Sequence, residues 1–299
     1  MSERVWLASY PKSGNTWFRL LVGCLALKDG ETVDVNQTAE KGGIASARLP
    51  FDVVTMIDSS LLTQDETDRL RPRVYEALTQ SLEEEPEEAG TTPDLEFVKA
   101  HDAYTLTSTG EPLLAGAGGA KAAILIVRDP RDVVASLANH NQSTLDEAIQ
   151  VMNDPVAALC GKTDRLHKQM RQIMLSWSGH AASWLDQRDI PVHLVSYEAL
   201  KRDTAATFAE AMAFAGRPIS LEEAARAARL ADFSELQAQE ATVGFGEKPP
   251  KTKAFFRKGQ TGAWREELTP EQLERVETAH ADMMGRLGYA PSWALERTG

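Results

Sequence analysis

The chain has 299 residues, with 32 Lys and Arg against 44 Asp and Glu, so its formal net charge is −12. Hydrophobic residues make up 42%, which supports a sizeable core and excludes an intrinsically disordered chain. The acidic balance argues against a surface for nucleic acid or an anionic membrane, because phosphate groups would be repelled on average. A local basic pocket for a small anion remains compatible with this charge.

The two cysteines, Cys24 and Cys160, are too few for a disulfide framework or a cysteine-rich metal site. The first residues have no signal-peptide layout. The longest apolar run, near 18–27, contains Arg19 and is too short to span a bilayer. We therefore expect a cytoplasmic protein without membrane association. The sequence carries no signal for the oligomeric state.

The first elements read as a strand, a tight turn and a helix. Arg4–Tyr10 is short and apolar, which predicts a buried strand, and apolar residues at helical spacing predict a helix just after Gly14. The interval at about 30–93 has a different pattern and is expected to be a mostly helical insertion. Its amphipathic stretch, Leu61–Leu82, is interrupted at Pro72.

Three further strands are predicted at Leu95–Ala100, Ala122–Val127 and Val192–Tyr197. The second of these has no polar residue, as expected of a central parallel strand that is buried on both faces. A helix follows Pro130, and a long helix is predicted across Thr163–Gln187. The rest is mostly helical.

Strands that alternate with helices indicate the α/β class. We expect a three-layer sandwich with a central, mainly parallel sheet of about four to five strands and a P-loop-like phosphate-binding turn. No composition shift divides the chain, so residues 1–299 are expected to form one domain. A Gly, Pro and Lys-rich segment at about 243–263 is expected to be a flexible covering loop.

The first segment with chemical potential, Tyr10–Trp17, lies between the first strand and helix. Gly14 permits close backbone approach, and a helix start offers unpaired N–H groups. Lys12, Ser13, Asn15 and Thr16 add one cation and short donors, so the segment suits a phosphate or sulfate. An ordinary polar turn with a helix cap is the alternative. The Gly-Lys-Ser/Thr order of nucleoside-triphosphate loops is missing, which disfavours a magnesium-dependent kinase.

The second segment, Val127–Ser136, follows the most apolar strand. Ligands of parallel sheets bind at the carboxyl ends of strands, so Arg128 is expected at the site, with Ser136 two turns into the next helix. The alternative is that Arg128 and Arg131 pair with Asp129 or Asp132 at the helix start.

The third segment, Phe256–Arg265, places two adjacent cations and two glycines in an otherwise acidic protein. Such a segment can surround a phosphate with main-chain and side-chain donors. The alternative is a solvated basic loop. This interpretation is less favoured when all three segments are considered together.

These three segments together resemble the cytosolic-type sulfotransferases, and we expect a bacterial-like member. The motifs Y-P-K-S-G-N-T-W, R-D-P-R-D-V-V-A-S and R-K-G-x-x-G-x-W occur in the family's order between Tyr10 and Trp264. The resemblance implies that 3′-phosphoadenosine 5′-phosphosulfate (PAPS) is the sulfuryl donor and that a small molecule accepts the group. Asn15 stands where many members carry a hydroxyl residue.

The resemblance also implies a role for each motif residue. Trp17 would stack on adenine, which Tyr197 and, by a looser match, Phe233 would also contact. The 5′-phosphosulfate would be held by Lys12, Ser13, Gly14, Asn15 and Thr16. The 3′-phosphate would be bound by Arg128, Ser136, Arg257, Lys258 and Gly259.

The family's catalytic base is a histidine in a K-x-H pattern after a short strand, and Lys99-Ala100-His101 matches it. Among six histidines, His101 alone follows a predicted sheet strand at its carboxyl end. His101 would remove the proton of an acceptor hydroxyl, or of an amine, during in-line transfer. Lys12 would stabilise charge on the leaving oxygen, and Lys99 would hold nearby charge or orient the acceptor.

No metal is expected, because no cluster of His, Asp and Glu is visible. The alternatives are a nucleotide or small-molecule kinase and a nucleotide-binding module without catalysis. The acceptor itself is not encoded in any motif, although its pocket is expected near 36–51 and after Asn139.

Overall fold

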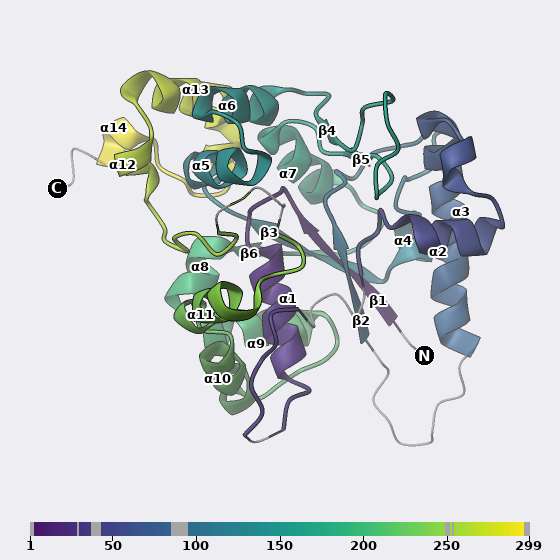
Figure 1. Ribbon diagram of the computed structural model, residues 1–299, viewed down its shortest axis with the longest axis horizontal. Helices are drawn as coiled ribbons and strands as arrows, with labels where there is room; N and C mark the ends of the chain where they lie inside the picture. The colour runs from purple at the N-terminus through teal and green to yellow at the C-terminus, as the bar shows by residue number, and fades with distance from the viewer. Residues whose placement is uncertain are drawn as a thin grey trace.

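The computed structural model describes residues 3–28, 30–36, 43–84, 95–248, 252 and 254–295 (Figure 1). Its centre is a parallel sheet with the strand order β2-β1-β3-β6. The strands are β1 (Glu3–Ser9), β2 (Leu95–Ala100), β3 (Ala122–Val127) and β6 (Val192–Ser196). The α/β prediction is confirmed. Because all four strands are parallel, their carboxyl ends meet at one edge, where a ligand can bind.

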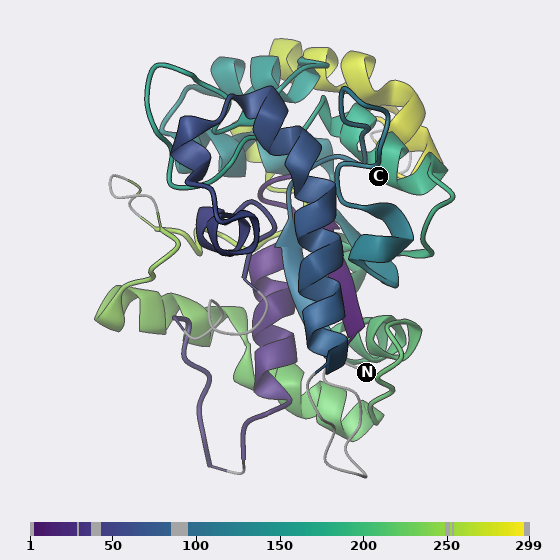
Figure 2. The same cartoon turned by 90° about the vertical axis from the view of Figure 1, so that its right-hand side faces the viewer.

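Alternate residues of β1 pack on opposite faces of the sheet. Val5 and Leu7 join one buried cluster with the helices on that face, whereas Trp6 and Ala8 join another on the opposite face. The first face is covered by α1 (Asn15–Cys24), α8 (Tyr197–Arg202), α9 (Thr204–Phe214), α10 (Leu221–Leu230) and α11 (Phe233–Val243). The second is covered by α3 (Gln64–Glu84) and α7 (Trp177–Asp186), and Figure 2 shows α3 running beside the strands. The expected three layers are present.

A further apolar cluster lies beyond the carboxyl edge of the sheet, where Tyr10 meets helices from the second half of the chain. These helices are α5 (Pro130–Asn141), α6 (Leu145–Asn153) and α13 (Pro270–Arg286), together with α7. The remaining elements are α2 (Arg48–Thr55), η2 (Ser59–Leu61), α4 (Gly116–Gly119), β4 (Ala158–Leu159), β5 (Gln172–Ile173), α12 (Trp264–Glu267) and α14 (Ser292–Leu295). The cluster supports the helix that carries the second motif.

The helix predicted across Thr163–Gln187 is wrong over its first half. Only α7 is helical there, and it begins after Ser176, whose side chain accepts the N–H of Gly179. The preceding residues form β5, which pairs with β4, and the main-chain N–H of Met170 donates to Ser46. Because neighbouring segments take up these backbone groups, local helix propensity does not decide the structure.

The interruption expected at Pro72 is absent, because α3 continues through this residue. Proline inside a helix costs about 3 kcal/mol. The flanking side chains Arg71 and Tyr75 are both buried and bonded to each other, with the guanidinium also held by Asp102. These contacts keep the helix in place across the proline.

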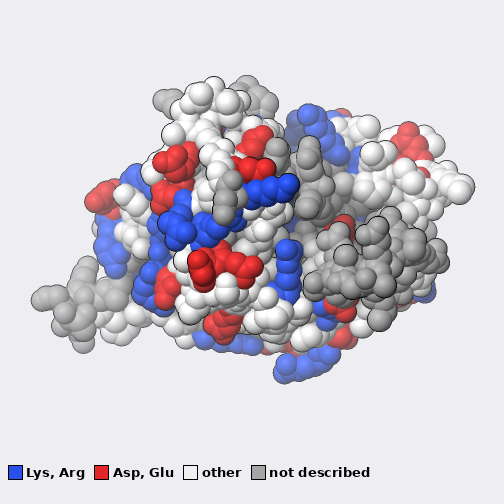
Figure 3. All heavy atoms as spheres, turned by 90° about the horizontal axis from the view of Figure 1, so that it is seen from below, with Lys and Arg blue, Asp and Glu red and all other residues white. Residues whose placement is uncertain are grey.

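The structure covers only parts of two regions singled out in the sequence. Residues 37–42 and 85–93 of the expected insertion, and 249–251 and 253 of the expected covering loop, lie outside the described residues. Among the helices that are described, none combines the length and apolar character needed to cross a membrane. On the face shown in Figure 3, basic and acidic side chains lie next to one another, so that face does not carry a single sign of charge.

Candidate active site

The main candidate site is a cavity of about 550 Å³ at the carboxyl edge of the sheet. It is lined by the turn after β1, the end of β2, α5, the start of α8 and the described residues at 246–247 and 255–263. The predicted residues that line it are Lys12, Gly14, Asn15, Thr16, Trp17, Lys99, His101, Arg128, Ser136, Tyr197, Phe233, Arg257, Lys258 and Gly259. Ser13 is buried beneath the turn and is not part of the lining.

The turn between β1 and α1 adopts a strained backbone to face this cavity. Lys12 has a φ of 70° and Gly14 a φ of 110°. A Cβ at Gly14 would lie 2.7 Å from Cδ2 of Tyr197, so only glycine allows this close approach. No side chain caps the start of α1, which leaves main-chain N–H groups and the positive end of the helix dipole available for an anion.

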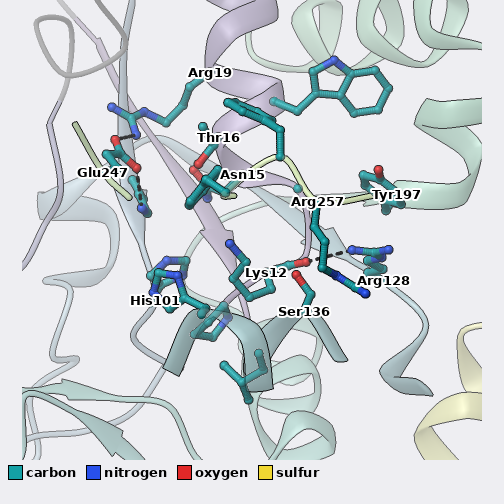
Figure 4. A pocket seen from close by; sticks show the side chains of 18 of the residues that line it. Lys12, Asn15, Thr16, Arg19, His101, Arg128, Ser136, Tyr197, Glu247 and Arg257 are labelled. Carbon is teal, nitrogen blue, oxygen red and sulfur yellow. Dashed lines mark hydrogen bonds and ion pairs between the residues drawn. The ribbon is translucent and has the colours of Figure 1, made fainter. Parts of the chain in front are cut away.

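Lys12 lies in the centre of the site, between His101 on one side and Arg128 with Ser136 on the other (Figure 4). Its Nζ is 3.7 Å from the centroid of the Phe255 ring. Burial, together with the positive charges of Lys99 and Arg128, lowers the pKa of Lys12 to about 7. Several cations around one cavity repel each other, and an anion bound between them relieves that repulsion.

The side chains of Ser13 and Asn15 differ in what they can offer a ligand. Asn15 donates its amide hydrogens to the Leu7 carbonyl at 2.8 Å and to Ser9 Oγ at 3.1 Å, so the amide ties the start of α1 to β1. Ser13 Oγ is buried without a hydrogen-bond partner in the described structure. A buried hydroxyl without a partner is costly, so this atom is open to a further hydrogen bond.

Arg128 links the three motifs. Its guanidinium donates to the main-chain carbonyls of Lys12 at 3.4 Å and Gln260 at 2.9 Å. Its Cζ lies 4.4 Å from the ring centroid of Tyr197. The Nε atom is buried and lacks a partner within the described residues. The alternative, in which both arginines pair with acids at the helix start, holds for Arg131, which pairs with Asp129 at 2.7 Å. It does not hold for Arg128, whose guanidinium bonds to main-chain carbonyls.

The third motif is held by carboxylates that the sequence analysis did not single out. Glu267 pairs with Arg257 and, at 2.8 Å, with Lys258, and these cations lower its pKa. Gly259 has a φ of 60°, and a Cβ there would lie 2.4 Å from the ring of Phe233. In the sequence, Glu267 is an acid ten residues after Arg257, and this spacing by itself predicts no contact.

Aromatic side chains line the part of the cavity between α1, α8 and α11. Trp17 Nε1 donates to the Ala231 carbonyl at 2.9 Å, and its ring meets that of Tyr197 edge to face at 5.8 Å. Lys201 Nζ lies 5.4 Å from the ring of Trp17 and 5.1 Å from that of Phe233. The three aromatic residues expected around adenine are thus brought together.

His101 sits at the end of β2 and is 9% exposed. Its Nδ1 donates to the Ser9 carbonyl at 2.7 Å, which places the lone pair of the neutral ring on Nε2. Burial and the charge of Lys99 hold the pKa of His101 well below 6.5. The ring is therefore neutral at physiological pH and can accept a proton.

Glu247 is a site residue that the sequence analysis missed. Its carboxylate pairs with Arg19 at 2.7 Å and with Lys99 at 3.3 Å (Figure 4). Together, these two ion pairs connect α1, β2 and the segment after α11. A lone acid in a Lys and Pro-rich stretch carried no signal for this contact. Lys99 is thereby held next to His101.

The end of the cavity near Lys99 is built from segments outside the motifs. Ile44 bridges to Lys99, and Ala47 bridges to Gln169. Gln172, which is 1% exposed, donates from Nε2 to Gln169 Oε1 at 2.9 Å. These residues line the cavity together with Leu137, His140, Asn141 and Leu159. Except for Lys99 and Leu137, they come from the intervals expected near 36–51 and after Asn139.

Behind His101, the next residue along the chain fixes the loop to α3. Asp102 accepts from Arg71 at 2.6 Å, and both side chains are at most 1% exposed. Asp102 Oδ1 also accepts the N–H of Ile173 at 3.0 Å. This buried ion pair connects the β2 end, α3 and β5. In the part of the chain that the structure describes, no three His, Cys, Asp or Glu side chains are placed to hold a metal ion.

The arrangement is that of an α/β protein with several cationic side chains and a histidine around one cavity at the carboxyl edge of its sheet. The model of the sulfotransferase domain family matches residues 2–288. The chain belongs to the sulfotransferase domain family.

The chain resembles human sulfotransferase 2B1, with 24% identity over 94% of this chain and 66% of that protein. The chain thus spans just under two thirds of the human relative, and 74% of its rat counterpart. Among solved structures, mouse sulfotransferase SULT7A1 complexed with PAP has a TM-score of 0.57 and 20% identity, covering 94% of this chain and 84% of that one. Retinol dehydratase, solved with androsterone and the inactive cofactor PAP, also gives 0.57 at 20% identity, covering 94% of this chain and 80% of that one. The human, rat and mouse relatives do not support the expected bacterial-like character.

Proposed function

We propose that this protein transfers the sulfuryl group of PAPS to a hydroxyl, or an amine, of a small molecule. The observation that carries the proposal is the convergence of three anion-binding segments and a neutral histidine on one cavity. The residues fit the donor, because Ser13 Oγ and Arg128 Nε are buried polar atoms without partners in the described structure. Two relatives were solved with PAP, the desulfated donor.

In the proposed mechanism, His101 Nε2 removes the proton of the acceptor as its oxygen or nitrogen attacks sulfur. A new bond to sulfur forms while the bond between sulfur and the bridging oxygen breaks, and that oxygen keeps the electron pair. Lys12 and the N–H groups of α1 stabilise this charge. General-base assistance is worth roughly 10²–10⁴-fold in rate. PAP leaves with the bridging oxygen.

Nucleotide recognition in the proposal follows the three motifs. Lys12, Gly14 and Thr16 hold the 5′-phosphosulfate, with Ser13 beneath them and Asn15 fixing the helix start. The 3′-phosphate is bound by Arg128, Ser136, Arg257, Lys258 and Gly259. The adenine is held by Trp17, Tyr197 and Phe233, and Lys99 orients the acceptor.

The proposal extends to the organisation of the chain. Residues 1–299 form one sulfotransferase domain with a mostly helical insertion at about 30–93. The segment at about 243–263 covers the nucleotide, which agrees with Phe255, Arg257 and Gly259 lining the cavity. A cytoplasmic location agrees with two unpaired thiols and with a relative named cytosolic sulfotransferase 17 in Arabidopsis thaliana, 21% identical.

Calorimetric titration with PAP, ADP and ATP without magnesium tests the proposal. We expect selective binding of PAP that is lost in Arg128→Ala and Arg257→Ala. Equal or preferred binding of ATP would overturn the proposal and favour a kinase. Binding of PAP without transfer from PAPS to any of a panel of phenols, alcohols and amines would instead indicate a nucleotide-binding module without catalysis.

A further inference from the structure

Asp132 is a buried acid inside a site that we propose for an anion. It is 2% exposed, lies in the first turn of α5 and lines the cavity. Ser136 follows four residues later on the same face of the helix. The neighbouring Arg131 pairs with Asp129 and Glu277. The contacts of Asp132 are directed instead toward the third motif.

Both oxygens of the Asp132 carboxylate accept main-chain N–H groups of that motif. Oδ2 accepts from Gly262 at 2.6 Å, and Oδ1 accepts from Trp264 at 3.0 Å. Gly262 has a φ of 77°, a conformation that glycine adopts without strain. The carboxylate of Asp132 therefore holds the turn at Gly262 in place through two main-chain hydrogen bonds.

The same segment is fixed a few residues earlier by α11. Gln237 Nε2 donates to the carbonyls of Phe256 at 2.7 Å and Arg257 at 2.9 Å. The stretch Arg257–Gly259 therefore lies between two anchored points, one on α11 and one on α5. The ring of Trp264 adds to the second anchor, because Arg131 Cζ lies 4.2 Å from its centroid.

Electrostatics alone would disfavour Asp132 here. A negative charge next to a phosphate site opposes binding of the phosphate, and burial of the carboxylate raises its pKa. The two N–H contacts offer a different reason for a carboxylate at this position. A carboxylate offers each N–H group an oxygen of its own, whereas an amide has only one acceptor oxygen and its nitrogen cannot accept.

We propose that Asp132 is a positioning residue, which holds Arg257–Gly259 in the geometry that binds the 3′-phosphate of the nucleotide. The inference rests on the proposed function, because it requires a ligand with that phosphate. It predicts that removal of a negative charge from the site weakens, rather than strengthens, binding of the anion.

The test compares the affinities of PAP and AMP, which differ only in the 3′-phosphate, by calorimetry. Asp132→Asn keeps the size of the side chain and removes one acceptor, and Asp132→Glu keeps the charge but displaces it. We expect Asp132→Asn to weaken PAP binding about tenfold, or about 1.4 kcal/mol, and AMP binding less than twofold. Asp132→Glu should also weaken PAP selectively. The matched control is Glu266→Gln, an exposed acid of the same segment, expected to change neither affinity more than about twofold.

The possible outcomes separate the explanations. Tighter PAP binding in Asp132→Asn would overturn the proposal in favour of simple charge repulsion. An equal loss for PAP and AMP in both variants would also overturn it, because it would indicate a general structural role. Thermal unfolding checks that each variant is folded, and Asp132→Glu decides the question if Asp132→Asn is not. Failure of the unmodified protein to prefer PAP over ADP would instead contradict the proposed function.

Discussion

The two ends of the cavity are built in different ways. The end that we propose for the nucleotide consists of three sequence motifs that contact one another, since Arg128 bonds to the carbonyls of Lys12 and Gln260. The end that we propose for the acceptor consists of short bridges between segments without motifs, such as Ala47 with Gln169. We refer to them as the nucleotide end and the acceptor end. In the proposal, one nucleotide contacts all three motifs, whereas the second end is held together by contacts between its own segments.

The largest expected effect is a loss of kcat on replacement of His101, which lies where the two ends of the cavity meet. His101→Ala should lower kcat by roughly 10²–10⁴-fold, while PAP affinity stays within about twofold, because His101 Nδ1 contacts the Ser9 carbonyl rather than a motif donor. Turnover with PAPS and calorimetry with PAP give the two values. Near-normal turnover in this variant would show that another group is the base.

A large effect on stability is expected behind His101, where Arg71 and Asp102 form a buried ion pair. Arg71→Met leaves Asp102 buried without its ion-pair partner at 2.6 Å, which costs about 3–5 kcal/mol. Urea denaturation measures the loss, with exposed Arg73→Met as the control, expected to change stability by less than about 1 kcal/mol. A loss as small as that of Arg73→Met would show that this pair does not anchor α3.

The nucleotide end should respond to a single methyl group. Gly259→Ala adds a Cβ that would lie 2.4 Å from the Phe233 ring at a φ of 60°. The backbone strain alone costs about 1–2 kcal/mol, so PAP affinity should fall about tenfold. Gly285→Ala, where a Cβ meets nothing within 4 Å, is the control. Unchanged PAP affinity in Gly259→Ala would place the 3′-phosphate elsewhere.

The smallest expected effect is a dependence of PAP affinity on pH. Lys12 has a pKa lowered to about 7 in the free protein, and a bound anion favours its charged form. Affinity should therefore fall as the pH rises from 7 to 8, by less than about tenfold. Calorimetry across this range measures the slope, which Lys12→Met should reduce. Equal slopes in both proteins would indicate that Lys12 stays charged in the free site.

The lowered pKa of Lys12 also makes the stability of the folded protein depend on pH, in the opposite direction from the affinity for PAP. Between pH 7 and about 10, the unfolded chain binds the Lys12 proton and the folded protein does not. Because stability rises with pH wherever the unfolded state binds more protons, the contribution of Lys12 to stability increases across this window. Ligand affinity and stability should thus change in opposite senses as the pH rises.

The sequence predicted the sheet and the residues of the three motifs that line one cavity, for a physical reason. Apolar strands and glycine-containing turns are local signals, so β2 and β3 were predicted with their observed bounds. The helix expected from Thr163 failed because β4 and Ser46 take up its backbone groups. Glu247 was missed because its partner Lys99 becomes a neighbour only in the folded chain. Glu267 was missed because its distance of ten residues from Arg257 matches no pattern of spacing. Contacts of this kind have no local signal.

The carbonyl of Ser9 has a consequence for how this enzyme can change. It orients the ring of His101, and the chain turns toward Lys12 only three residues later. In the proposed mechanism, the end of β1 thus orients the proton acceptor and leads into the turn that carries the cation beside the leaving oxygen, so a backbone shift there would displace both. Libraries that aim to widen the range of acceptors should leave β1 intact. They should vary Ala47 and Leu159, which line the cavity outside the motifs.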